Sequence, residues 1–181
     1  MSQLHRRADY QPPAYWIETV DLHVEVDTET RVTARLTVQR AEGVRADTPL
    51  RLDARGLTGV SMAVDGVPVP PEARPQTDLD VTLAGLPSAF VLETVTLLQP
   101  EANAALEGFY QSGPMYCTQC EAHGFSRITP FPDRPDVLSR FTVRLEADAV
   151  RFPVLLANGN RIEAGSLADG RHYAVWQDPH A

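Results

Sequence analysis

The residues best suited to do chemistry lie close together between positions 117 and 123. Cys117 and Cys120 form a C-x-x-C pair, and His123 follows three positions later. Such a pair can supply half of a zinc site, act as a redox dithiol, or consist of two ordinary reduced cysteines. Gln119 and Glu121 add two oxygen acceptors without a counter-charge, which suits a cationic guest such as an ammonium group.

The cysteines permit three interpretations. Structural zinc needs four ligands, whereas Cys117, Cys120 and His123 supply only three, so a distant His or carboxylate would have to complete the set. A thioredoxin-like dithiol stands at the start of a helix in a βαβ unit, and the surroundings of this pair read as strands. The sequence therefore favours two reduced cysteines in a packed loop and leaves the zinc and redox interpretations open.

Gln119 and Glu121 occupy alternate positions. In an extended segment both side chains would project to the same side, where they could bind one cation together. A solvated polar loop is the simpler interpretation of the spacing alone.

A second charged group, Asp133-Arg134-Pro135-Asp136, has a structural interpretation. Asp136 is expected to cap a short helical turn over Val137–Arg140. Arg134 is expected to hold the loop in place through a carboxylate.

Alternating apolar and polar residues predict strands along most of the chain. Residues 20–26 and 32–38 alternate on both sides of a short polar turn, which is typical of a β-hairpin with one solvated face. Asp65-Gly66 predicts a second hairpin, whose prolines confine the return strand to a sheet edge. Residues 90–98 are apolar on both faces and predict a central strand. Further strands are expected at residues 50–52, 79–83, 141–145, 154–157 (a buried run) and 173–175.

These short strands predict an all-β fold, either an antiparallel β-sandwich or a saddle-shaped sheet. Residues 106–141 do not alternate and are rich in aromatics and prolines, so we expect one long irregular loop that serves binding. With 181 residues, of which 43% are hydrophobic, residues 1–181 are expected to form a single domain.

Composition narrows the choice of partners. The 16 basic residues are all arginines and face 24 acidic residues, which gives a net charge of −8. This balance argues against nucleic acid or an anionic membrane as partner. No apolar run approaches the ~20 residues of a membrane span. The N-terminal arginines are not followed by the apolar stretch of a signal peptide, so a cytoplasmic location is expected.

One resemblance connects these residues. The segment ALEGFYQSGPMYCTQCEAHGFSRITPFPDRPDVLSRFTV resembles the N-terminal domain of bacterial aminopeptidases in the M1 family of zinc metallopeptidases. The likeness extends to AYWIETVDLHVEVD, PLRLDARGL and PVLLANGNRIEAGSLADGRHYAVWQDP, and so covers nearly the whole chain. It implies a β-sandwich or saddle that covers a catalytic domain. It also implies that the central loop lends Gln119 and Glu121 to the active site, where they bind the free α-amine of a peptide.

The family's zinc motif H-E-x-x-H and its G-x-M-E-N loop are absent from these residues. Two histidines and a glutamate base are needed to hold the zinc and activate its water, so the chain alone is expected to have no catalytic residue, no metal ligand and no activity. The resemblance implies zinc in a longer enzyme, and as partners peptides with a free N-terminus and the enzyme's own catalytic domain. Self-association of the isolated chain is expected through an open strand edge or through the central loop, whose aromatics would be exposed.

Two other classes of protein remain open on the sequence alone. One is a stand-alone, non-catalytic β-sandwich that serves as an interaction module. The other is a small metal or redox module built on the two cysteines, which stoichiometric zinc in the purified chain would reveal.

Overall fold

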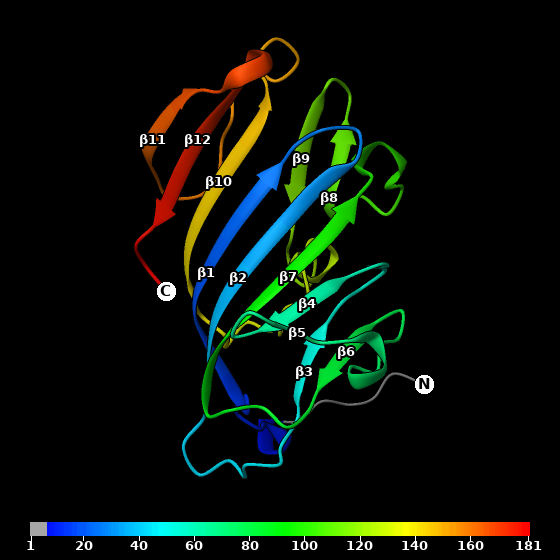
Figure 1. Ribbon diagram of the computed structural model, residues 1–181, viewed down its shortest axis with the longest axis vertical. Coiled ribbons are helices and arrows are strands. Elements are labelled where there is room, and N and C mark those ends of the chain that lie inside the picture. Colours follow the sequence, from blue (N-terminus) through cyan, green and yellow to red (C-terminus); the bar gives the residue numbers. More distant parts are fainter. Residues whose placement is uncertain (1–6) are drawn as a thin grey trace.

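A computed structural model describes residues 7–181 of the chain and is shown in Figure 1. Eight strands form one sheet in the order β11-β12-β10-β1-β2-β7-β4-β5, and two further sheets contain two strands each, β3-β6 and β8-β9. Only short 3-10 turns interrupt the strands of the described part, and none of its helices is long and apolar enough to cross a membrane. The strands are β1 (Tyr15–Glu25), β2 (Thr30–Arg40), β3 (Leu50–Asp53), β4 (Ser61–Val64), β5 (Val67–Pro68), β6 (Asp80–Leu83), β7 (Ala89–Leu98), β8 (Gly108–Ser112), β9 (Met115–Gln119), β10 (Arg140–Asp148), β11 (Asn160–Ser166) and β12 (Arg171–Asp178). The 3-10 turns are η1 (Arg7–Asp9), η2 (Pro71–Ala73), η3 (Pro100–Ala102), η4 (Phe125–Arg127) and η5 (Ala168–Gly170).

The hairpin of β1 and β2 confirms the strongest alternation in the sequence. Val20 pairs with Leu36 and Val24 pairs with Val32, and all four side chains are buried on one face. The intervening Asp, His and Glu residues point to the other face. Burying alternate branched residues on one side is what stabilises a sheet that is solvated on the other.

The hairpin predicted at Asp65-Gly66 and the central strand predicted at residues 90–98 also form. β4 and β5 make a hairpin in which Asp65 and Gly66 have φ values of 49° and 78°. Positive φ at both central residues is what a tight two-residue hairpin turn requires. β5 stands at the sheet edge, as Pro68 predicts, and β7 lies between β2 and β4.

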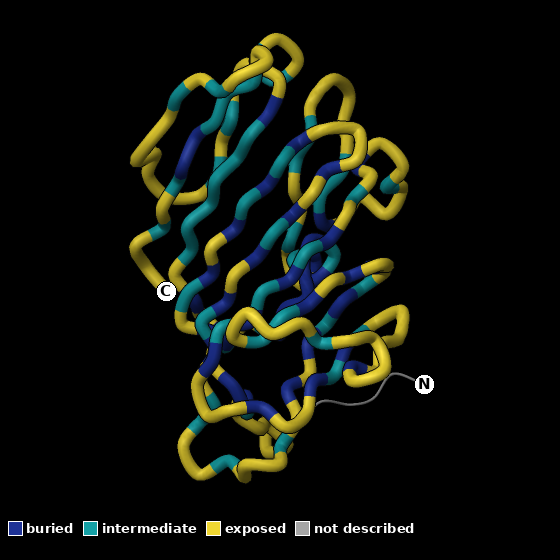
Figure 2. The backbone as a smooth tube through the Cα atoms, viewed as in Figure 1, coloured by how far each residue is buried: buried dark blue, intermediate teal, exposed yellow. Residues whose placement is uncertain are grey.

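The core lies between the large sheet and a smaller second layer. The second layer consists of the β3-β6 pair and the segment around residues 128–137, whose apolar side chains meet the inner faces of β1, β2 and β7. Figure 2 shows the buried residues running along these central strands, while the loops at both ends are exposed. The largest fully buried side chains are Ile17, Leu36, Leu52, Leu83 and Leu92.

The sheet departs from the antiparallel arrangement expected from the sequence at one place. β1 and β10 run parallel, with Val20 beside Phe141, whereas the other pairs of strands are antiparallel. Parallel neighbours cannot be joined by a tight turn and need a long crossover connection. The chain between β7 and β10, residues 99–139, contributes to this connection and carries the candidate site.

A buried strand at residues 154–157 is not found. Val154 is 69% exposed and Leu156 is 70% exposed, and both lie in a loop before β11. An apolar run does not by itself indicate burial, because burial depends on a packing partner elsewhere in the chain. The all-β class and the dominant sheet are confirmed, whereas this element was assigned wrongly.

Candidate functional site

Residues 108–119 form a β-hairpin, where the sequence predicted an irregular loop. β8 pairs with β9 so that Ser112 stands opposite Met115, and within residues 7–181 the pair forms its own two-stranded sheet. Gly113 has a φ of 58°, as the first residue of a two-residue hairpin turn requires. Gly113-Pro114 between two five-residue runs is the signal that could have revealed the hairpin.

Gln119 and Glu121 stand at the end of this hairpin. Gln119 is the last residue of β9, Glu121 begins the turn that follows, and both are exposed. The Gln119 Nε2 donates to the Glu121 backbone oxygen at 3.3 Å. Strand alternation therefore does not align the two residues as expected, because the extended backbone ends at Gln119. The turn itself brings them together.

Gly124 closes the turn by a close backbone approach. Its N–H donates to the Cys120 carbonyl at 2.8 Å. A Cβ at this position would lie 2.3 Å from the Gln119 carbonyl oxygen, nearer than any side chain tolerates. Because only glycine fits there, backbone packing fixes the chain that carries Gln119 and Glu121.

Asp133 links the turn to the core strand β3. Its carboxylate accepts from the Ser126 N–H at 2.9 Å, and its carbonyl lies 2.9 Å from the His123 Nδ1. Its own N–H donates to the Asp53 carboxylate at 3.0 Å, and Asp53 also exchanges two backbone hydrogen bonds with Phe131. Asp53 and Asp133 are 80 positions apart, so sequence spacing could not indicate this link.

A second set of contacts holds the hairpin body. Arg151 donates to the Glu101 carboxylate at 2.6 Å and to the Tyr116 hydroxyl at 2.8 Å. The hydrogen bond from Tyr116, followed by that from Arg151, holds the pKa of Glu101 below its usual range. The Tyr116 ring also packs on Phe152, with 4.9 Å between the centroids. Sequence reasoning missed this cluster, because its members come from separate segments that only the fold brings together.

Arg134 holds its loop through a carboxylate, as expected. It donates to both carboxylate oxygens of Asp136 at 2.6 Å, and the Tyr10 hydroxyl reaches the same group at 2.9 Å. The Arg134 contact keeps the pKa of Asp136 below its usual range. The helical turn expected over Val137–Arg140 does not form, and β10 begins at Arg140. The Asp136 carboxylate accepts instead from Arg134 and Tyr10.

Cys117 and Cys120 are both free and half-buried. Burial, reinforced by the negative charge of Asp133, raises the pKa of Cys120 to about 11, so its reactive thiolate is scarce at neutral pH. Within the described residues the two cysteines and His123 do not bring three ligand atoms together. The geometry therefore does not fit the zinc site that their spacing left open.

Residues 7–181 bring together one set of three metal-ligating groups, on the outer face of the large sheet. The ligand atoms of His23, Glu25 and Glu146 lie within 4.8 Å of one another. The His23 Nε2 lies 2.9 Å from the Glu146 Oε1, and Arg144 donates to that same oxygen at 2.6 Å. A guanidinium bound to the carboxylate competes with any cation, so we interpret the group as an ion-pair network.

Comparison with known proteins connects this fold to a family. A family model described as the Peptidase M1 N-terminal domain matches residues 12–181. The chain belongs to this family. The resemblance recognised from the CTQCE and DRPDV segments is thereby confirmed.

The relatives of this M1 N-terminal domain are much longer than the chain. Aminopeptidase N of Caulobacter vibrioides is 49% identical over 176 residues, which cover 95% of this chain and 20% of that protein. Aminopeptidase N of Escherichia coli is 42% identical over 177 residues, which cover 98% of this chain and 20% of that protein. The chain thus spans about a fifth of the length of these relatives.

Solved structures agree with the fold of the M1 N-terminal domain. Legionella pneumophila aminopeptidase A, crystallised in complex with aspartic acid, matches with a TM-score of 0.89 and 28% identity over 98% of this chain and 21% of that one. An M1 zinc metallopeptidase from Deinococcus radiodurans matches with a TM-score of 0.72 and 21% identity over 91% of this chain and 39% of that one. The second likeness concerns the fold alone.

Proposed function

We propose that this M1 N-terminal domain is part of a zinc aminopeptidase that removes N-terminal residues from peptides. Its relatives at 49% and 42% identity are both named aminopeptidase N, and their likeness extends over almost the whole chain. In this proposal the hairpin β8-β9 and its following turn face the active site, and Gln119 and Glu121 bind the α-amine of the substrate.

The observation that carries the proposal is an exposed carboxylate without a cationic partner. Glu121 forms no ion pair with any of residues 7–181, although ten other ion pairs occur there. The Gln119 Nε2 is directed to the Glu121 backbone, which leaves its Oε1 as a second acceptor. An ammonium group carries three donors and a charge, and these two oxygens complement it.

The role of the pair is to orient the substrate. Glu121 would attract the ammonium group, and Gln119 would fix its direction, so that the first peptide bond lies at a set distance from the turn. Orientation of this kind lowers the barrier by prepaying the entropy of alignment. Neither residue takes or gives a proton.

The metal belongs to another part of the longer enzyme. Zinc would supply an activated water when bound there. The present chain has no H-E-x-x-H motif, and Cys117, Cys120 and His123 do not assemble into a site. We therefore assign catalysis to the catalytic domain of the same enzyme and expect the 181-residue chain to be inactive alone.

Replacement of Glu121 in the longer enzyme tests the proposal. Glu121→Ala should lower kcat/KM for peptides with a free N-terminus by about 10²–10³, the scale of a lost buried charge contact. Gln119→Ala should cost less, because the lost partner is neutral. The measurement is the initial rate on amino-acyl anilides over a range of substrate concentrations.

The matched control is Glu42→Ala, which removes an exposed carboxylate from the loop between β2 and β3. It should leave kcat/KM unchanged. If Glu121→Ala also stayed within twofold of the parent, the assignment of the amine site would be wrong.

A further inference from the structure

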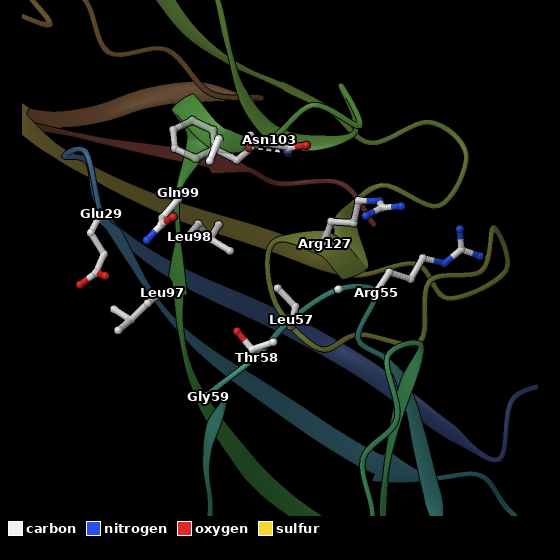
Figure 3. Close-up of a pocket in the computed structure, with 13 residues that line it drawn as sticks. Glu29, Arg55, Leu57, Thr58, Gly59, Leu97, Leu98, Gln99, Asn103 and Arg127 are labelled. Atoms are coloured by element: carbon white, nitrogen blue, oxygen red, sulfur yellow. Dashed lines mark hydrogen bonds between the residues drawn. The ribbon is translucent and has the colours of Figure 1, made fainter.

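A cleft of about 550 Å³ opens between the loop that joins β3 to β4 and the end of β7. Small-molecule sites commonly have volumes of roughly 300–1,000 Å³, so the cleft has the size of a binding site. Figure 3 shows Arg55 and Arg127 extending to the same side at one end of it, with Glu29 at the opposite end. Leu57 and Leu98 lie between the two ends. The cleft is separate from Gln119 and Glu121.

Of the two guanidinium groups at this end of the cleft, only that of Arg127 is paired with a carboxylate of the described residues. Arg127 donates from Nε to Glu107 at 2.8 Å. Arg55 is only half exposed and forms no ion pair or side-chain hydrogen bond with any of residues 7–181. The Arg127 Nη1 lies 3.6 Å from the point where a Cβ would stand on Gly56, directly beside Arg55 in the chain. The described residues that line this end of the cleft therefore include two guanidinium groups and no carboxylate.

A half-buried guanidinium without a partner has lost part of its hydration, and no hydrogen bond or ion pair within the protein compensates for that loss. The neighbouring Arg127 raises the free-energy cost of the unpaired Arg55 guanidinium further, because like charges repel. An anion with two or more oxygens would relieve both costs, since the guanidinium fork matches carboxylate and phosphate in a bidentate manner.

We propose that this cleft binds a small oxyanion, either a carboxylate or a phosphate, between Arg55 and Arg127. The Thr58 hydroxyl lines the same cleft and is a neutral donor for a further oxygen. Glu29 repels an anion from the opposite end and so restricts binding to the arginine end. The net charge of −8 excludes a general attraction of anions, so this binding is a local property of the cleft.

The test is a titration of the ¹⁵N-labelled 181-residue chain, followed by NMR at constant ionic strength. Inorganic phosphate and succinate are added separately, and sodium chloride serves as the blank. We expect saturable shifts at Arg55, Gly56 and the Arg127 Nε–H. Arg55→Gln should weaken binding by about tenfold or more, the scale of a lost charge-assisted hydrogen-bond pair. Arg55→Lys keeps the charge but not the forked guanidinium, so its affinity should lie between that of the parent and that of Arg55→Gln.

Arg45→Gln is the matched control. Arg45 is exposed and already bound to Asp47, so its loss changes the net charge equally without touching the cleft. It should leave the affinity unchanged. Saturation by phosphate alone, by succinate alone or by both supports the oxyanion site and identifies the anion it accepts. Shifts that follow ionic strength only, or an affinity in Arg55→Gln within twofold of the parent, would overturn the proposal.

Discussion

Cys120 shows how burial decides the chemistry of a residue that the sequence made conspicuous. A C-x-x-C pair suggests reactivity, but a reactive cysteine needs a stabilised thiolate. Burial does the opposite here, because it penalises the charged form and raises the pKa of Cys120 to about 11. The folded state therefore favours the neutral thiol. The neutral Cys120 thiol contributes fully to the stability of the folded state at pH values below the pKa that Cys120 has in the unfolded chain. This contribution is lost as the pH rises through about 11.

The labelling rate of Cys120 should follow this pKa. In a Cys117→Ser variant, iodoacetamide should modify Cys120 slowly up to pH 9, and the rate should climb as the pH approaches about 11. Mass spectrometry of the peptide that ends at Arg127 gives the rate at each pH. An unfolded sample in urea provides the reference and should titrate near the ordinary thiol value of about 8.5. Equal profiles for the folded and unfolded chains would contradict the assignment.

At the scale of elements, alternation predicted most of the strands, including β3 and β6 outside the large sheet, and missed the hairpin β8-β9. β1 and β2 alternate cleanly because one face meets the core and the other meets water. The hairpin β8-β9 has no such contrast, since Phe109, Tyr110 and Tyr116 are all half-buried against small neighbouring elements. A periodic pattern of apolar residues arises where one face of a strand or helix is buried. No such pattern arises where a strand packs against irregular segments.

The candidate site was predictable to a similar extent. The residue types Gln119 and Glu121 stand in the sequence, and the family resemblance singles them out. Their anchoring by Asp133 and Asp53 could not be foreseen, because the link joins distant segments through side-chain to backbone hydrogen bonds. Such contacts leave no periodic pattern in a single sequence.

The hairpin should loosen when its clamp is removed. Arg151→Gln deletes the guanidinium that donates to both Glu101 and Tyr116, and the hairpin is not hydrogen-bonded to the large sheet. We expect the backbone amides of β8 and β9 to exchange about two- to fivefold faster, in keeping with the modest strength of exposed ion pairs. Hydrogen exchange followed by mass spectrometry measures the change.

The same experiment on Arg45→Gln provides the comparison, because Arg45 pairs with Asp47 far along the chain from the hairpin. That variant should leave β8 and β9 unchanged, and in Arg151→Gln the central strands β1 and β2 should keep their protection. Uniform acceleration across the large sheet would mean that Arg151 supports the whole fold instead of the hairpin.

At the scale of the whole molecule, the two edges of the large sheet are unequally protected. β5 is a two-residue strand that contains Pro68, and both features discourage pairing with another chain. β11 has seven residues, and exposed apolar side chains gather on it and on the loop before it. These side chains are Val150 (90% exposed), Val154 (69%), Leu156 (70%) and Ile162 (56%). Arg161 and Glu163 place charges on β11 and oppose, without removing, the tendency to pair.

We therefore expect the isolated chain to self-associate through β11. Sedimentation velocity over a concentration series should show a monomer that gives way to a dimer as concentration rises. Ile162→Lys places a charge in the middle of the edge and should shift that transition about tenfold or more higher, because a charge buried without a partner opposes strand pairing. Val67→Lys on β5 adds the same charge to the protected edge and should have no effect. A chain that stays monomeric throughout, or equal shifts from the two variants, would show that β11 is not the contact.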